Sequence, residues 1–73
     1  MDKLTQKKQI LEHLKKHGSI TPLEALDNYG CMRLGARIWD LRHDGHQIRM
    51  ELTRAFNIDT LKTSHYARYI LVE

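Results

Sequence analysis

The sequence predicts a single α+β domain over residues 1–73, in which three helices precede a C-terminal antiparallel hairpin. Up to Gly45 the apolar residues recur at intervals of three and four, which is typical of helices. After Gly45 they recur at every second position, which is typical of strands. Glycines at positions 18, 30 and 45 stand where each helical pattern stops. A chain of 73 residues has room for one small core.

The first predicted helix covers residues 4–17 and ends at Gly18. Its apolar face consists of Leu4, Ile10, Leu11 and Leu14, and lysines cover much of the remaining surface. Residues 19–21 form a short extended link in which Ile20 points inward. The lysine-rich surface is most simply a solvated face, although Lys7 or Lys8 is also placed to contact a phosphate.

A second, short helix begins directly after this link. Thr21 can cap it with its hydroxyl, Pro22 suits the first helical position, and Glu24 can reach back to the cap amide. Gly30 is free to adopt the left-handed conformation that ends many helices. The pattern therefore predicts a helix from residue 22 to about residue 29.

A third helix is predicted to start near Cys31 or Met32 and to continue to about residue 44. Leu34, Ile38 and Leu41 are spaced by four and three, so they share one stripe and should be buried. Two helices joined by a short turn containing glycine form the helix-turn-helix pattern.

The C-terminal region is predicted to form two strands joined by a long loop. Residues 47–54 alternate so that Ile48, Met50 and Leu52 face the core, residues 55–65 form the loop, and residues 66–72 form the second strand. In the second strand the inward positions are Ala67, Tyr69 and Leu71, and the outward positions are Tyr66, Arg68 and Ile70. Phe56 should fold back on the core. Ile58 and Leu61 are most simply explained in the same way, and the alternatives for these two are a subunit contact or an apolar wedge.

This order of elements is that of a winged helix-turn-helix domain, with the hairpin as the wing. The segment 34–45, LGARIWDLRHDG, followed by Ile48, resembles the third helix and the start of the next strand in a family of small winged-helix proteins of phages and prophages. It is also similar to the DNA-binding domain of biotin repressors. The closing Tyr66-Ala67-Arg68-Tyr69 with Leu71 resembles the final strand of the phage family. The resemblance implies the winged-helix fold and a double-stranded DNA partner, and we expect a small phage- or prophage-type transcription regulator. Two departures are Cys31 at a position often held by Thr or Ser, and a wing without glycine.

The third helix, residues 32–44, is the candidate for the major groove, which admits an α-helix. Arg33 and Arg37 lie one turn apart near its start, where a pair of base-reading side chains is expected. Ala36 between them permits close approach to the bases, and Met32 and Asp40 share the outer surface. The competing interpretation is that Arg37 pairs with Asp40 across one turn.

The wing supplies a second set of candidate DNA contacts, for a phosphate backbone or a minor groove. Its members are Arg54, Lys62, Thr63 and Ser64. Two other side chains have structural interpretations. The guanidinium of Arg42 should bind a carboxylate or a backbone carbonyl near the wing, and Trp39 should close one edge of the core or mark a dimer interface.

Several function classes are disfavoured by the sequence. The single cysteine excludes an internal disulfide and fits a reducing, cytoplasmic compartment, and no segment is apolar enough to span a membrane. No glycine-rich phosphate loop or nucleophile elbow is present, and so small a domain has little room for a substrate pocket. His13 and His17 have a metal-compatible spacing but no evident third ligand. We therefore expect no enzyme activity, cofactor, metal or small-molecule ligand.

Three functions stay open on these observations. The first is a sequence-specific DNA-binding regulator, which we favour. The second is an excisionase-like architectural or recombination factor, and the third is a winged helix used only to bind proteins. A weak homodimer through the wing edge is also expected, because one module buries too little DNA surface for tight binding and because spare apolar residues are available there. These residues are Ile58, Leu61, Ile70 and Trp39.

Overall fold

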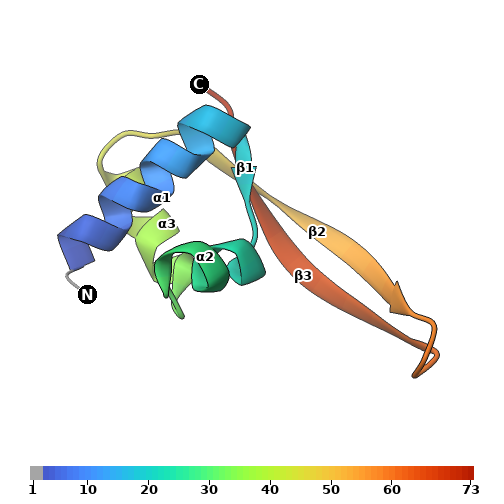
Figure 1. Cartoon of the computed structure of the whole chain (residues 1–73). Coiled ribbons are helices and arrows are strands. Elements are labelled where there is room, and N and C mark those ends of the chain that lie inside the picture. Colours follow the sequence, from blue (N-terminus) through green and yellow to red (C-terminus); the bar gives the residue numbers. More distant parts are fainter. Residues whose placement is uncertain (1–2) are drawn as a thin grey trace.

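The computed structural model describes residues 3–73, with side chains from Thr5 onward, so the expected role of Leu4 lies outside the described side chains. Three helices gather at one end of the molecule, and a long two-stranded ribbon projects from them (Figure 1). The elements are α1 (Lys3–His17), β1 (Ser19–Ile20), α2 (Pro22–Tyr29), α3 (Leu34–His43), β2 (Ile48–Asn57) and β3 (Lys62–Leu71). The predicted order of elements is confirmed.

The three strands form one antiparallel sheet in the order β1-β3-β2. The short β1 pairs with the far end of β3, where Ser19 lies opposite Ile70 and Ile20 opposite Tyr69. The backbone N–H of Leu71 also donates to the carbonyl oxygen of Gly18 at 3.0 Å. The last strand of the chain is therefore the central one of the sheet.

The core lies between the helices and the base of this sheet. The predicted stripe of Leu34, Ile38 and Leu41 is buried, as expected. It packs with apolar residues contributed by the other elements: Ile10, Leu14, Ile20, Ala25, Cys31 and Ile48. Leu11, Tyr29, Tyr69 and Leu71 are partly buried against its edge.

Helix α2 begins as the sequence predicts. The backbone N–H of Glu24 donates to the Thr21 hydroxyl at 3.3 Å, and the Thr21 N–H donates to the Glu24 carboxylate at 2.9 Å. These reciprocal bonds form a complete capping box, with Pro22 in the first turn. At the other end Gly30 has φ +63°, the left-handed conformation expected of a helix-ending glycine.

Helix α3 starts later than predicted. Its first residue is Leu34 and its N-cap is Arg33, whereas the sequence pattern placed the start at Cys31 or Met32. The cause is the end of α2, because Gly30 is left-handed and the Cys31 N–H donates back to the carbonyl oxygen of Ala25 at 3.1 Å, so Cys31 belongs to the turn that follows α2. Cys31 is buried in the core, so this side chain does not cap the helix.

The predicted loop over residues 55–65 is wrong for most of its length. The strands β2 and β3 stay paired from Ile48 opposite Leu71 out to Asn57 opposite Lys62, so only residues 58–61 connect them. Asn57 stabilises this turn, because its side-chain oxygen accepts bonds from the N–H groups of Asp59 and Thr60. We refer to the ribbon of residues 48–71 as the wing and to residues 57–62 as the wing tip.

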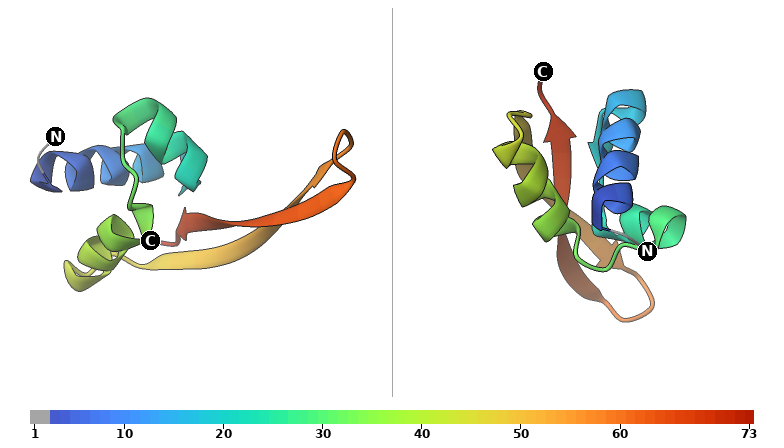
Figure 2. Two further views of the ribbon diagram at one scale, coloured as in Figure 1. Left: turned by 90° about the horizontal axis from the view of Figure 1, so that it is seen from below. Right: turned by 90° about the vertical axis from the view of Figure 1, so that its left-hand side faces the viewer.

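The expected burial of the wing is also wrong beyond its base. Ile48 is buried, but Met50 is largely exposed, Leu52 is 67% exposed and Phe56 is 63% exposed. Ile58 and Leu61 do not fold back on the core either. The reason is visible from two further directions: the ribbon extends beyond the helices, so none of the elements within residues 3–73 covers its distal half (Figure 2).

The outer positions of β3 are more enclosed than the alternation predicted. Tyr66, Arg68 and Ile70 are half-buried. Pairing with β1 covers the region around Ile70, and the guanidinium of Arg68 donates to the Ser19 hydroxyl at 3.1 Å.

Candidate nucleic-acid interface

One side of α3 is turned toward α1. Arg37 and Asp40 form an ion pair with 3.1 Å between Nε and Oδ2, without hydrogen-bond alignment of these two atoms. Their side chains are only 15% and 13% exposed. Asp44 continues the same stripe one turn further and accepts a 2.6 Å hydrogen bond from Lys7 of α1. This stripe therefore faces the neighbouring helix.

These contacts bear directly on two of the predicted DNA-reading residues. The structure contains the alternative Arg37–Asp40 pair that the i, i+3 spacing allowed. An Arg37 guanidinium held in this way must give up its partner before it can reach a base edge. The hydrogen bond from Lys7 also lowers the pKa of Asp44, so this carboxylate stays ionised to lower pH. Base readout by Arg37 or Asp40 stays a prediction.

The exposed side of α3 carries different residues. Met32 and Arg33 project from the start of the helix, and within residues 5–73 the guanidinium of Arg33 has no hydrogen-bond or ion-pair partner. Further along, Trp39 is 58% exposed and stacks on His43, with ring centroids 3.6 Å apart. Trp39 therefore does not close the core, which corrects that expectation.

The Trp39–His43 pair was not identified as a binding site from the sequence. His43 Nδ1 lies 3.0 Å from the carbonyl oxygen of Trp39, and a carbonyl can only accept, so Nδ1 carries the proton. Nε2 is then the ring nitrogen left for an external partner. The i, i+4 spacing of the two rings was the available signal, because residues four apart share a helix face.

Arg42 has the structural role predicted for it. Its Nε and Nη2 atoms both donate to the carbonyl oxygen of Ile48, at 3.1 and 2.8 Å. This bond ties the last turn of α3 to the first residue of β2. It therefore fixes the orientation of the wing relative to the helix.

The four candidate residues of the wing fall on two opposite faces. Directly opposed residues in an antiparallel pair point to the same side, and successive residues alternate. Arg54 and Thr63 consequently lie on the same face of the ribbon as Ile48. Lys62 and Ser64 lie on the other face, together with Tyr66. The structure therefore does not gather all four into one contact surface.

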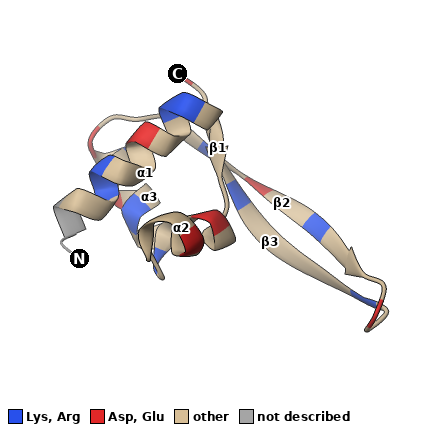
Figure 3. Ribbon diagram, in the orientation of Figure 1, with Lys and Arg blue, Asp and Glu red and all other residues tan. Residues whose placement is uncertain are grey.

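Charge is distributed unevenly over the molecule (Figure 3). Lysines of α1 and arginines of the ribbon supply most of the positive charge, whereas α2 contains Glu24 and Asp27 and no basic residue. Several cations are paired within the chain: Lys7 with Asp44, Arg37 with Asp40, and Arg49 with Glu51. The net charge of +3 is thus less important than which cations remain unpaired.

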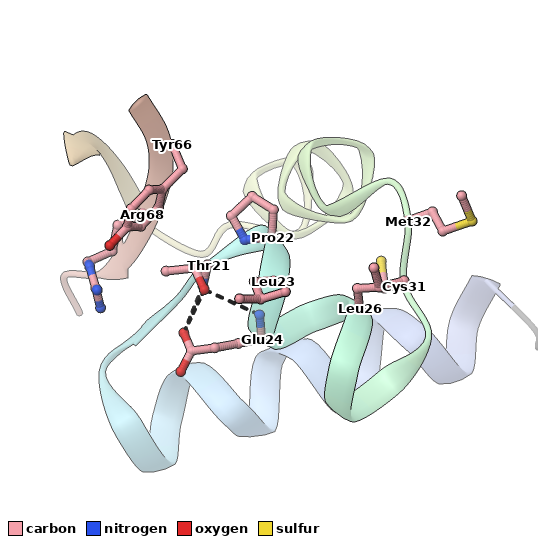
Figure 4. A pocket seen from close by; sticks show the side chains of 9 residues that line it. All are labelled: Thr21, Pro22, Leu23, Glu24, Leu26, Cys31, Met32, Tyr66 and Arg68. Atoms are coloured by element: carbon pink, nitrogen blue, oxygen red, sulfur yellow. Dashed lines mark hydrogen bonds between the residues drawn. The ribbon is translucent and has the colours of Figure 1, made fainter. Parts of the chain in front are cut away.

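A groove lies between α2 and the outer face of β3 (Figure 4). It has a volume of about 620 Å³, which is enough to hold several side chains. Its lining is largely apolar and includes Pro22, Leu23, Leu26, Met32 and Tyr66, with Arg68 at the strand side. Leu26 is 47% exposed in this lining.

A buried histidine links α1 to α2 on another side of the domain. His13 Nδ1 lies 2.8 Å from the Tyr29 hydroxyl, and Nε2 lies 4.0 Å from a Glu24 carboxylate oxygen. Burial lowers the pKa of His13, and the nearby His17 and Lys16 act in the same direction, whereas Glu24 opposes them. Within residues 3–73 no three His, Cys, Asp or Glu side chains are placed to hold a metal ion.

Comparison with known proteins gives one family. The family model described as a winged helix-turn-helix domain matches residues 5–73. No curated protein and no solved structure matches the chain. Across the described part of the chain, none of the helices has the length and apolar character needed to cross a membrane.

Proposed function

We propose that this chain, which belongs to the winged helix-turn-helix family, is a sequence-specific double-stranded DNA-binding protein that acts as a small phage- or prophage-type transcription regulator in the cytoplasm. The fold itself suggests a DNA partner. In the proposed complex α3 enters the major groove, and the wing contacts the backbone or the minor groove.

The observation that carries this proposal is the unpaired Arg33 at the N-terminus of α3. Side chains at the start of a recognition helix reach base edges most readily, and arginine binds guanine through two parallel hydrogen bonds. Exposed Met32 and half-buried Ala36 lie beside it. Trp39 and His43 are exposed further along α3, so we add them to the proposed contacts.

Arg54 is our candidate in the wing for a contact with the phosphate backbone. It is exposed, and it shares a ribbon face with Thr63. Arg49 lies on the opposite face and donates to Glu51 at 3.3 Å. The two wing arginines therefore differ in orientation and in pairing, which makes Arg49 a matched control for Arg54.

The surface of α2 supports a second candidate function. A helix with two acidic residues and exposed Leu23 and Leu26 is poorly suited to lie on phosphates, because the carboxylates would repel them. A contiguous exposed apolar surface is typical of protein–protein contacts. A winged helix used only as a protein-binding module is therefore the alternative that this surface favours.

Selection of bound sequences from random duplex DNA at two salt concentrations tests the proposal. A regulator of this kind enriches one short sequence at both concentrations, and Arg33→Ala then weakens specific binding by ~1–3 kcal/mol and relaxes the preference at one base position. Arg54→Ala should weaken binding to all sequences alike and reduce the salt slope by about one, whereas Arg49→Ala should change neither.

The outcomes separate the candidate functions. Binding without sequence enrichment, together with shortening of the end-to-end distance of a labelled duplex, would instead support an excisionase-like architectural factor. Absence of binding at the lower salt concentration would reject DNA recognition and leave the protein-binding module.

A further inference from the structure

Two exposed apolar surfaces of this chain have no partner within residues 5–73. The first is the α2 groove lined by Leu23, Leu26, Met32 and Tyr66. The second is the wing tip, where Ile58 is 77% exposed and Leu61 is 73% exposed. The first surface is concave and the second protrudes, and both are apolar.

The backbone conformation of Leu61 is unusual for a leucine. Leu61 has φ +56°, the left-handed region that Gly, Asn and Asp adopt with less strain than leucine. Leucine is thus unfavourable here for the backbone and also exposes an apolar side chain to water. Both disadvantages would be offset if the side chain is buried in a complex.

The wing tip cannot fill the groove of its own chain. Tyr66 lines the groove, and the tip ends at Lys62, four residues earlier along the same paired strand. At ~3.4 Å per residue this separation is about 14 Å, and the ladder of strand hydrogen bonds holds the two points apart. Any contact between tip and groove must therefore join two molecules.

We propose that the wing tip of one copy of this chain docks in the α2 groove of a second copy, and that the exchange is reciprocal. In this two-fold dimer the two wings run antiparallel, so each tip reaches the other chain's groove. The ribbon face that carries Tyr66 has the small residues Ala55 and Ser64 opposite each other between groove and tip. Small side chains at this point allow the two ribbons to cross closely.

The charges of the two surfaces are complementary. Glu24 and Asp27 give α2 two negative charges, which outweigh the single positive charge of Arg68 at the strand side of the groove. Beyond Leu52, Arg54 and Lys62 outweigh Asp59, so the distal wing is net positive. Two copies placed tip to groove therefore attract each other. This inference is independent of DNA binding, and it assigns the wing tip to a second copy of the chain.

Sedimentation equilibrium of the intact chain without DNA tests the proposal. The wild-type chain should dimerise, and Leu61→Asn or Leu23→Gln should raise the dimer dissociation constant about tenfold or more, because each change removes a buried apolar side chain from both contacts. Val72→Ser is the matched control, since Val72 is an exposed apolar residue outside the groove and the tip. It should leave the dissociation constant unchanged.

Folding is monitored separately. Leu61→Asn should keep or raise the melting temperature measured at a concentration where the chain is monomeric, because asparagine tolerates the left-handed conformation. Leu23 is exposed at the start of α2, so Leu23→Gln should also leave the monomer folded. Loss of dimer with an unchanged monomer then reports on the interface alone.

Mixing the two variants tests whether the dimer contact joins a wing tip to an α2 groove. Leu23→Gln has an intact tip and Leu61→Asn has an intact groove, so an equimolar mixture should form a heterodimer with one complete contact. Side-by-side pairing of strand edges would not give this recovery. Each of four results would overturn the proposal. The wild-type chain could stay monomeric at millimolar concentration, or both variants could retain the dimer. Val72→Ser could lose the dimer to the same extent, or the mixture could form no heterodimer.

Discussion

Replacing Ile38 and Leu52 separately with alanine compares two apolar residues that the sequence pattern assigned to the same core. Ile38 is 1% exposed and lies among the buried residues of the three helices, whereas Leu52 is 67% exposed on the wing. Removing a buried isoleucine side chain costs ~2–5 kcal/mol, from lost burial and from the cavity that remains. Leu52→Ala should change the free energy of unfolding by no more than ~0.5 kcal/mol, as is usual for exposed positions.

The cost at Ile38 is large relative to the whole domain. At ~0.05–0.15 kcal/mol per residue, a chain of 73 residues has a free energy of unfolding of roughly 4–11 kcal/mol. For a domain of this size ~1 kcal/mol lowers the melting temperature by about 4–8 °C, so even a 2 kcal/mol loss lowers it by roughly 8–16 °C. Urea titrations and thermal melts followed by far-UV circular dichroism measure both variants. Equal destabilisation by the two substitutions would refute the reasoning, because it would mean that the distal wing is packed.

Three further predictions concern single contacts. Thr21→Ala removes the α2 cap and should cost ~0.5–2 kcal/mol in urea unfolding, whereas Thr21→Ser should retain most of the stability. The folded-state pKa of His13 is lowered, so near pH 6.5 the unfolded chain binds more protons than the folded chain. The free energy of unfolding should therefore fall as the pH drops from 7.5 through 6.5, and denaturant titrations at several pH values measure this. The fall should be smaller in His13→Gln. Lys7→Ala should raise the pKa of Asp44 toward its ordinary value in a carbon-detected NMR titration, and an unchanged value would mean that the hydrogen bond is absent in solution.

Local chemistry made the helical region predictable. The capping box at Thr21 and Glu24 and the left-handed Gly30 involve residues within a few positions of one another, so the sequence contains all the information they need. The buried stripe around Ile38 follows from helix periodicity in the same way. The bond from Arg42 to the Ile48 carbonyl was predictable because only a few residues separate helix and strand.

The exposure of residues in the candidate site depends on tertiary contacts that could not be predicted from the sequence. Alternation in β2 shows that Met50 and Leu52 share a face with Ile48, but it does not show whether another element covers that face. The sequence does not show where α1 packs, so it allowed the flank of α3 that carries Arg37 to be assigned to DNA. The hydrogen bond from Lys7 to Asp44 shows that α1 lies beside this flank. The roles of Arg33, Arg54 and the other predicted DNA contacts remain predictions.

The central position of β3 has a consequence for how the chain folds during synthesis. Helices α1, α2 and α3 leave the ribosome first, but Ser19 and Ile20 of β1 have no strand partner until Tyr69 and Ile70 have been made. Contacts between residues so far apart in sequence slow folding, because a long loop must close before they form. The nascent helices therefore keep the core side of Ile20 incompletely covered until Tyr69 and Ile70 have been synthesised, and a chain truncated within residues 62–71 loses the middle of its sheet as well as its wing.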